Sequence, residues 1–281
     1  SRLGIQTQTI EAFVQNVLPR FFNDDGPLDA QKYSRLITEL ASHPTLVNDE
    51  NICRQLGALP IVPTKDGRWS RPTKVYRRTD DLVKVLGEAT HLWLDASRVP
   101  DARSIHTFID NIGLRRSPMA EHLVERMLFI AEKYLPTEDA KRASGEAFYT
   151  LCDHYEEWKE KPFFLAALKQ LSGMKCFPAV SDTESWFSAS ELYAPYRSEA
   201  FRSQAKILDF KNTARLKTAL LDELKVTINP ETSLVIGHLQ HCVKIGSQPH
   251  NFTYLVLNER AQRADPQIST LADSRCIYVE Q

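Results

Sequence analysis

The chain has 281 residues, of which 42% are hydrophobic and 25% are charged, a composition typical of a folded globular protein that excludes a disordered or fibrous one. Its formal net charge of -1 argues against a protein that wraps along DNA or lies on an acidic membrane, although a local basic patch is compatible with it. The length favours two domains or a short array of packed units.

The first predicted helix carries an apolar stripe with the 3.6-residue period of one helix face, made of Ile10, Phe13, Val14, Val17, Leu18 and Phe21. A similar stripe follows Pro118 and contains Leu123, Val124, Met127 and Ala131. A third stripe follows Pro230, at a constant offset of 112 residues from the second, and contains Val235, Ile236, Leu239 and Val243. A small cluster precedes each stripe and opens the helix that carries it, as Leu3-Gly4-Ile5, Ile112-Gly113-Leu114 and Leu224-Lys225-Val226.

Two further helices follow the first stripe, and their apolar residues recur at an offset of 115 residues. In the longer helix, the matched sets are Tyr33, Leu36, Ile37 and Leu40 with Phe148, Leu151, Cys152 and Tyr155. In the shorter one, they are Ile52, Cys53 and Leu56 with Ala167, Leu168 and Leu171. A last helix, over about 105–112 in the first copy and about 216–224 in the second, is expected to close each unit.

A β-hairpin is predicted between the shorter helix and the closing helix, first over 59–76 and again over 175–193. The first copy, LPIVPTKDGRWSRPTKVY, consists of an apolar run, an Asp-Gly turn and a return centred on a tryptophan. The second copy keeps three marker residues of the first, so that Pro63, Trp69 and Tyr76 match Pro178, Trp186 and Tyr193. This shared pattern is stronger evidence for a repeat than helical stripes alone.

The sequence therefore predicts an α+β fold of predominantly helical repeat units, each with a small antiparallel β-hairpin. The predicted units are 1–113 with the hairpin 59–76, 114–225 with the hairpin 175–193, and 226–281 as the truncated start of a third unit. In that third unit, Leu271, Arg275, Cys276 and Ile277 match Leu171, Lys175, Cys176 and Phe177. This organisation is typical of a piece excised from a longer repeat protein in which neighbouring units share apolar surface.

The five cysteines include no C-x-x-C pair, which disfavours a disulfide scaffold and favours a reducing, cytoplasmic compartment. Cys53, Cys152, Cys176 and Cys242 align with apolar residues of another copy, so we expect these thiols in the core. Two alternatives compete with this expectation. The helical spacing of His238, His241 and Cys242 suits a zinc site, and Cys152 next to His154 suits a thiol beside a base. We disfavour both, because Cys242 and Cys152 occupy core positions of the repeat.

Motifs for catalysis are missing from the sequence. It contains no G-x-S-x-G elbow, Walker A loop, G-x-G-x-x-G fingerprint or H-E-x-x-H helix. Its 10 glycines are dispersed, so no backbone cradle for a nucleotide phosphate is predicted. No apolar run approaches the roughly 18–20 residues of a membrane span, and no signal peptide opens the chain. We therefore expect a chain that is not an enzyme, with no catalytic residue, no cofactor, no metal and no membrane partner.

One surface feature stands above background, a basic stretch around Trp69. Within 14 residues that hold a single acid, Asp66, lie Lys65, Arg68, Arg71, Lys74, Arg77 and Arg78. Strand alternation is expected to place several of these cations on one face, where they would contact phosphates. The alternative, which we favour, is an edge strand protected from aggregation by its cations. We expect Trp69 itself to lie in the core.

The motif LPIVPTKDGRW at 59–69, followed by RPTKVY at 71–76, resembles a hairpin that recurs in the long regions of sacsin-like proteins, and most closely in their large bacterial relatives. The resemblance covers about 3–225 and is weaker in the second hairpin, where 180–185 replaces the Asp-Gly turn. It implies that such segments follow an Hsp90-like ATPase domain, that the parent protein is chaperone-like, and that several bacterial members act in defence against phage. No ATP-binding residue of that family has a match in this chain.

These observations predict a non-catalytic scaffold or partner-binding segment, whose partners are other regions of the same long protein or separate proteins. The alternative is a nucleic-acid-contacting module that uses the basic hairpin from Lys65 to Arg78. The two differ in one measurable property, because only the second predicts oligonucleotide binding that weakens steeply with salt.

Overall fold

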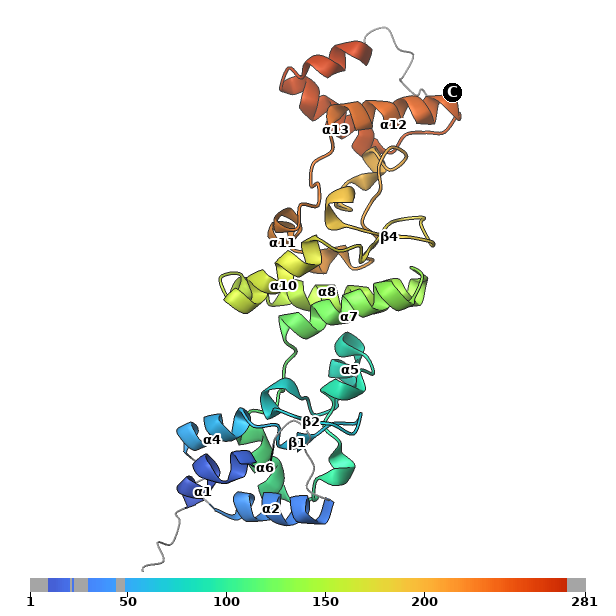
Figure 1. Ribbon diagram of the computed structural model, residues 1–281. Coiled ribbons are helices and arrows are strands. Elements are labelled where there is room, and N and C mark those ends of the chain that lie inside the picture. Colours follow the sequence, from blue (N-terminus) through green and yellow to red (C-terminus); the bar gives the residue numbers. More distant parts are fainter. Residues whose placement is uncertain (1–9, 21, 23–29, 44–48, 272–281) are drawn as a thin grey trace, which may run out of the picture. The chain divides into compact units, whose positions relative to one another are not determined.

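The computed structural model describes residues 10–20, 22, 30–43 and 49–271. Its contacts divide the chain into two compact units, Ser1–Pro118 and Met119–Gln281 (Figure 1). Both units are mostly helical, and each contains one small antiparallel hairpin, so the predicted fold class is confirmed. The partition into 1–113, 114–225 and 226–281 stays a prediction.

The first unit consists of helices and short 3-10 turns around one hairpin. Its elements are α1 (Ile10–Asn16), η1 (Leu18–Arg20), α2 (Ala30–Ser42), α4 (Glu50–Gly57), β1 (Val62–Pro63), β2 (Trp69–Ser70), η2 (Pro72–Lys74), α5 (Asp80–Leu86), η3 (Thr90–Leu92), η4 (Ala96–Arg98) and α6 (Arg103–Asn111). Local sequence sets the helix starts. The Asp49 carboxylate caps α4 by accepting the N–H groups of Asn51 and Ile52 at 2.8 and 3.1 Å, and the Thr79 hydroxyl caps α5.

The core of the first unit uses the predicted apolar stripes. The buried members are Val14, Leu18, Tyr33, Ile37, Leu40, Ile52, Cys53 and Leu56. Phe13 and Leu36 are partly buried against the same cluster, whereas Phe21 lies outside the described residues. The hairpin and α6 complete this core through Ile61, Val62, Val75, Ile105, Phe108 and Ile109. Helical periodicity therefore predicted the packing faces of this unit correctly.

The second unit begins with a long helical pair and ends with another. Its elements are α7 (Ala120–Lys133), α8 (Glu138–Asp153), α9 (Tyr155–Trp158), α10 (Pro162–Ser172), β3 (Phe177–Pro178), β4 (Trp186–Phe187), η5 (Ala189–Glu191), η6 (Ser198–Ala200), η7 (Thr213–Arg215), α11 (Thr218–Glu223), α12 (Thr232–Lys244), α13 (Asn251–Gln262) and η8 (Pro266–Leu271). Leu123, Val124, Met127, Phe148 and Leu151 are fully buried, as their stripes predict.

The third stripe lies on α12, whose Val235, Ile236 and Leu239 pack with α13 and with Phe201 after η6. Val243 departs from the prediction, because 46% of its surface is exposed. Its counterpart in α7, Ala131, is partly buried against a cluster that contains the hairpin tryptophan Trp186. No described residue provides such a tryptophan for α12.

The two hairpins have the same register around their shared residues. Pro63 pairs with Trp69 in β1–β2, and Pro178 pairs with Trp186 in β3–β4. The predicted spans 59–76 and 175–193 are too long for the strands, however, since each strand has only 2 residues. A proline ends the first strand of each hairpin and has no N–H to extend the ladder. The second strand gives way to a 3-10 turn, η2 or η5.

The marker tyrosines lie beyond these 3-10 turns and pair with later segments of their own unit. Tyr76 forms parallel bridges with Trp93 and Arg115, and Tyr193 forms parallel bridges with Ile207 and Thr227. Because each tyrosine backbone lies between two later segments, it belongs to a small closing layer rather than to the hairpin. The second strand expected from the sequence is therefore two separate extended segments joined by a 3-10 turn.

The cluster Ile112-Gly113-Leu114 ends α6 instead of opening the next helix, which corrects the prediction. Gly113 has a φ of 105°, and Lys225 in the matching cluster Leu224-Lys225-Val226 has a φ of 64°. In both turns the residue after this position donates its N–H to the carbonyl five residues earlier, which is the pattern of a Schellman helix end. Leu3-Gly4-Ile5 lies outside the described residues, as do Arg275, Cys276 and Ile277.

Candidate functional site

The predicted basic site occupies the hairpin turn, β2, η2 and the extended segment after it. Lys65, Arg68, Arg71, Lys74 and Arg78 are exposed, and Arg77 is half-buried. Only a short part of this stretch is a β-strand, so strand alternation does not arrange these side chains as expected. Their positions follow from a turn and a 3-10 helix instead.

Ion pairs neutralise half of the basic site. Arg68 pairs with Asp66 at 3.6 Å, Arg77 with Asp110 at 3.3 Å, and Arg78 with Glu88 at 2.5 Å. Asp110 and Glu88 are distant in the sequence, which is why a count of acids within the stretch missed them. In the part of the chain that the structure describes, the remaining Lys65, Arg71 and Lys74 form no ion pair.

Trp69 is half-buried and packs against the core of the first unit, so the prediction that it lies in the core is only partly confirmed. Its ring centroid is 4.6 Å from that of Tyr33 in an edge-to-face contact and 6.0 Å from that of Phe22. The guanidinium of Arg98 lies over the ring, 4.9 Å from its centroid. Base stacking on this tryptophan would therefore require displacement of Arg98 or of core side chains. The matching Trp186 is 8% exposed and donates its indole N–H to the Tyr134 carbonyl at 2.8 Å.

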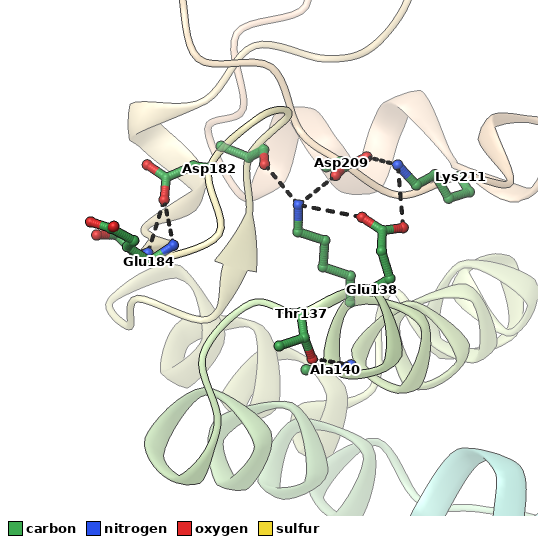
Figure 2. Close-up of polar contacts among 10 residues, drawn as sticks. Thr137, Glu138, Ala140, Asp182, Glu184, Asp209 and Lys211 are labelled. Atoms are coloured by element: carbon green, nitrogen blue, oxygen red, sulfur yellow. Dashed lines mark hydrogen bonds and ion pairs between the residues drawn. The ribbon is translucent and has the colours of Figure 1, made fainter.

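The most deeply buried charges lie in the second unit, at a site that sequence reasoning missed. The Lys141 side chain is 4% exposed and donates to the Asp209 carboxylate at 2.8 Å and to the Ala179 carbonyl at 3.2 Å. Lys211 donates to the other Asp209 oxygen at 2.8 Å and lies 3.7 Å from Glu138 (Figure 2). We call these four charged residues, Glu138, Lys141, Asp209 and Lys211, the Lys141 cluster.

The Lys141 cluster joins two segments that are far apart in the sequence, the start of α8 and 209–211, and Lys141 reaches a third segment through the Ala179 carbonyl. Lys141 comes from the first turns of α8, which the Thr137 hydroxyl caps by accepting the Ala140 N–H (Figure 2). Burial alone would raise the pKa of the Asp209 carboxyl, but the hydrogen bonds from Lys141 and Lys211 outweigh it, so the pKa lies below its ordinary value. Two cations face two carboxylates, so the cluster has no excess positive charge with which to bind an anion. Its role is structural, because its ion pairs connect the start of α8 to 209–211.

Comparison with the first unit shows that the aspartate of the Lys141 cluster has a counterpart there, Asp95. The Asp95 N–H donates to the Pro63 carbonyl at 2.9 Å, and the Asp209 N–H donates to the Pro178 carbonyl at 3.0 Å. In the first unit, however, the Asp95 carboxylate caps η4 through the N–H of Ser97. The recurrence of this aspartate in both copies could therefore have identified Asp209 as a candidate residue from the sequence. Nothing in the sequence near Lys141 points to its partner.

The cysteines within the described residues are buried thiols, as the repeat comparison predicted. Burial raises the pKa of Cys152 to about 11 and that of Cys176 to about 12. Burial, together with the nearby Asp49 carboxylate, also raises the pKa of Cys53. Cys276 lies outside the described residues. These raised values favour the unreactive protonated form of the thiols.

The two alternative cysteine sites have different outcomes. His154 stacks on Trp158 with ring centroids 4.3 Å apart and lies 3.3 Å from Glu157, so it is not engaged with Cys152. In the zinc hypothesis, the His238 Nε2 atom lies 3.7 Å from the Cys242 Sγ atom, but His241 is exposed. Across the described ranges, no three His, Cys, Asp or Glu residues are grouped to hold a metal ion.

Acid is expected to weaken the second unit through His238. Its side chain is buried, and burial, followed by the charges of Arg202 and His241, lowers its pKa below the ordinary value of 6.5. The unfolded chain therefore binds this proton first, so the stability contribution is present above pH 6.5 and is lost as the pH falls through the lowered pKa. The free energy of unfolding should fall by up to about 1.4 kcal/mol per pH unit in that window.

Urea unfolding at pH 7.5 and 5.5 measures this effect. His238→Gln should have a smaller pH dependence than the wild type, and the control His91→Gln, at an exposed position of the first unit, should retain the full dependence. Equal pH dependence in all three proteins would contradict the assignment to His238.

No helix among the described residues combines the length and the apolar character needed to cross a membrane. Comparison of the chain with protein-family models, curated proteins and solved structures found no match.

Proposed function

We propose that this chain is a non-catalytic scaffold or partner-binding segment of a larger sacsin-like, chaperone-like ATPase protein of the kind linked to defence against phage. The resemblance of the first hairpin supports the ATPase and defence parts of this proposal, and the cysteine pattern supports a cytoplasmic location. Its proposed partners are other regions of the same long protein or unfolded segments of other proteins. The observation that carries the binding role is an apolar surface on α10.

The α10 outer face consists of three exposed residues, Phe163, Leu165 and Ala166. Phe163 is 42% exposed and Leu165 is 50% exposed. The buried side of α10, which includes Phe164, Ala167, Leu168 and Leu171, already provides the packing that the unit needs. The outer face is therefore apolar surface beyond the requirement of the fold.

The matching helix of the first unit shows that the repeat does not require this apolar surface. Glu50 and Asn51 of α4 occupy the positions of Leu165 and Ala166, at the same offset of 115 residues that matches the core positions of these helices. Both are exposed. Because the fold accepts a charged and a polar residue at these positions, the apolar pair in α10 supports a binding role specific to the second unit.

An aggregation assay tests this proposal. The wild-type chain should slow the aggregation of a chemically unfolded client protein, and the double change Leu165→Glu and Ala166→Asn, which copies the α4 pair, should reduce that effect severalfold. Asn51→Asp on α4 is the matched control and should leave it unchanged. Undiminished suppression by the α10 variant, with its helix content intact, would count against the proposal.

The nucleic-acid alternative rests on Lys65, Arg71 and Lys74, the exposed cations of the hairpin that form no ion pair among the described residues. It is weaker, because the other cations of the site are already paired and Trp69 is packed under Arg98. Tight binding of a labelled oligonucleotide, steeply dependent on salt and abolished by changing these residues to Glu, would favour this alternative.

A further inference from the structure

A cavity of about 400 Å³ lies beside α12 in the second unit. It is bounded by the η6 region, by α12 and by the start of α13, elements that can be followed in Figure 1. Its lining includes Glu199, Arg202, His238, Cys242, His250 and Asn251. Two of the three residues considered above as zinc ligands, His238 and Cys242, line this cavity, and the third, His241, does not.

His238 and Cys242 form a thiol–imidazole pair that faces this cavity. They are one helical turn apart on α12, and the Nε2 and Sγ atoms lie 3.7 Å from each other. Both side chains are buried, at 5% exposure each. The ring is held in this orientation by the Ser203 hydroxyl, 2.7 Å from Nδ1, and Ser203 in turn accepts a hydrogen bond from the Gln204 amide at 3.0 Å.

The surroundings of Cys242 differ from those of Cys152 and Cys176. Cys53 also lines a cavity, beside Glu50 and Arg54, but no histidine is among the described residues that line that cavity. Arg202 and the N-terminus of α13 at Asn251 line the same cavity, and both favour a negative charge. Glu199 is the one carboxylate among the lining residues named for this cavity. Burial lowers the pKa of His238, so its ring is neutral at neutral pH, and one nitrogen of a neutral ring has a free lone pair. The Nε2 atom, 3.7 Å from the thiol, is placed to be that acceptor. Cys152 and Cys176 are fully enclosed, at 0% exposure each.

We propose that Cys242 is a modification site, a reactive thiol for small uncharged electrophiles that enter this cavity, with His238 as its proton acceptor. This inference is independent of the proposed scaffold function. In the reaction with iodoacetamide, the sulfur forms a bond to the methylene carbon, the carbon–iodine bond breaks, and iodide leaves with the bonding electron pair. The thiol proton passes to the Nε2 atom of His238 and from there to solvent.

Native labelling with iodoacetamide tests the proposal in the full chain, with Cys276→Ser as the background so that only the described thiols compete. Peptide mapping by mass spectrometry gives the rate at each cysteine. We expect Cys242 to react at least about tenfold faster than Cys53, Cys152 and Cys176, as expected for a thiol activated by neighbouring cationic groups. Equal rates, or faster reaction at any other of these thiols, would overturn the proposal.

Two variants test the role of the imidazole. His238→Gln should slow labelling of Cys242 severalfold, and its circular dichroism shows whether the helices are retained. Ser203 is exposed, so Ser203→Ala should not disturb the core. This change should slow labelling of Cys242 to a smaller extent, because it removes only the hydrogen bond that orients the His238 ring. His91→Gln, at an exposed position of the first unit, is the control and should have no effect. A labelling rate at Cys242 unchanged by both His238→Gln and Ser203→Ala would show that the imidazole has no part in the reaction.

Discussion

Replacing Lys141 by methionine is expected to destabilise the second unit by about 3 kcal/mol, at the lower end of the cost of breaking a buried ion pair. The change leaves the Asp209 carboxylate, whose side chain is 7% exposed, without its buried partner. It also removes the donor to the Ala179 carbonyl. Lys211 still pairs with Asp209, which limits the loss.

Urea unfolding followed by tryptophan fluorescence and circular dichroism measures this loss. Lys211→Met is the matched control, because its side chain is 68% exposed and its ion pair with Asp209 should contribute no more than about 1 kcal/mol. Adding Asp209→Leu to Lys141→Met should recover part of the stability, since the unpaired carboxylate is then gone. Equal losses in the free energy of unfolding for Lys141→Met and Lys211→Met would show that the buried ion pair contributes no more to stability than the exposed one.

Gly57→Ala is expected to destabilise the first unit by about 2–3 kcal/mol, the cost of forcing extra volume into a packed site. A Cβ atom at Gly57 would lie 2.5 Å from the carbonyl oxygen of Ile112. That oxygen belongs to the backbone of the turn that ends α6, so it has no flexible side chain to move away. The end of α4 and the closing turn would have to separate.

The matching helix provides the control for this change. Gly173 follows α10, and a Cβ atom there would lie 3.8 Å from the Gln170 carbonyl oxygen, an ordinary van der Waals distance. With a φ of -88°, Gly173→Ala should be neutral or stabilising by about 0.4–1 kcal/mol. The melting temperatures of both variants show whether the loss comes from the clash with the Ile112 carbonyl or from any replacement of glycine at the end of these helices. Equal destabilisation by the two changes would rule out the specific contact between Gly57 and Ile112.

The sequence by itself determined the fold class, the apolar faces of the helices and the presence of two hairpins with matching proline and tryptophan residues. These features depend on local periodicity and on residues close together in the chain. The stripe containing Leu123, Val124 and Met127 is buried because a helix must place such positions on one face. The burial of the described cysteines followed in the same way, from comparison of one copy with another.

Only the tertiary structure decided which side chains from distant segments meet. Lys141 and Asp209 are 68 residues apart, and no periodicity relates them. Acids outside the basic stretch, Asp110 and Glu88, neutralise cations that the sequence alone presented as free. Spacing placed His238 and Cys242 one turn apart, but the cavity beside them exists because η6 and the start of α13 approach α12 there. Long-range packing, which no local pattern encodes, determined each of these sites.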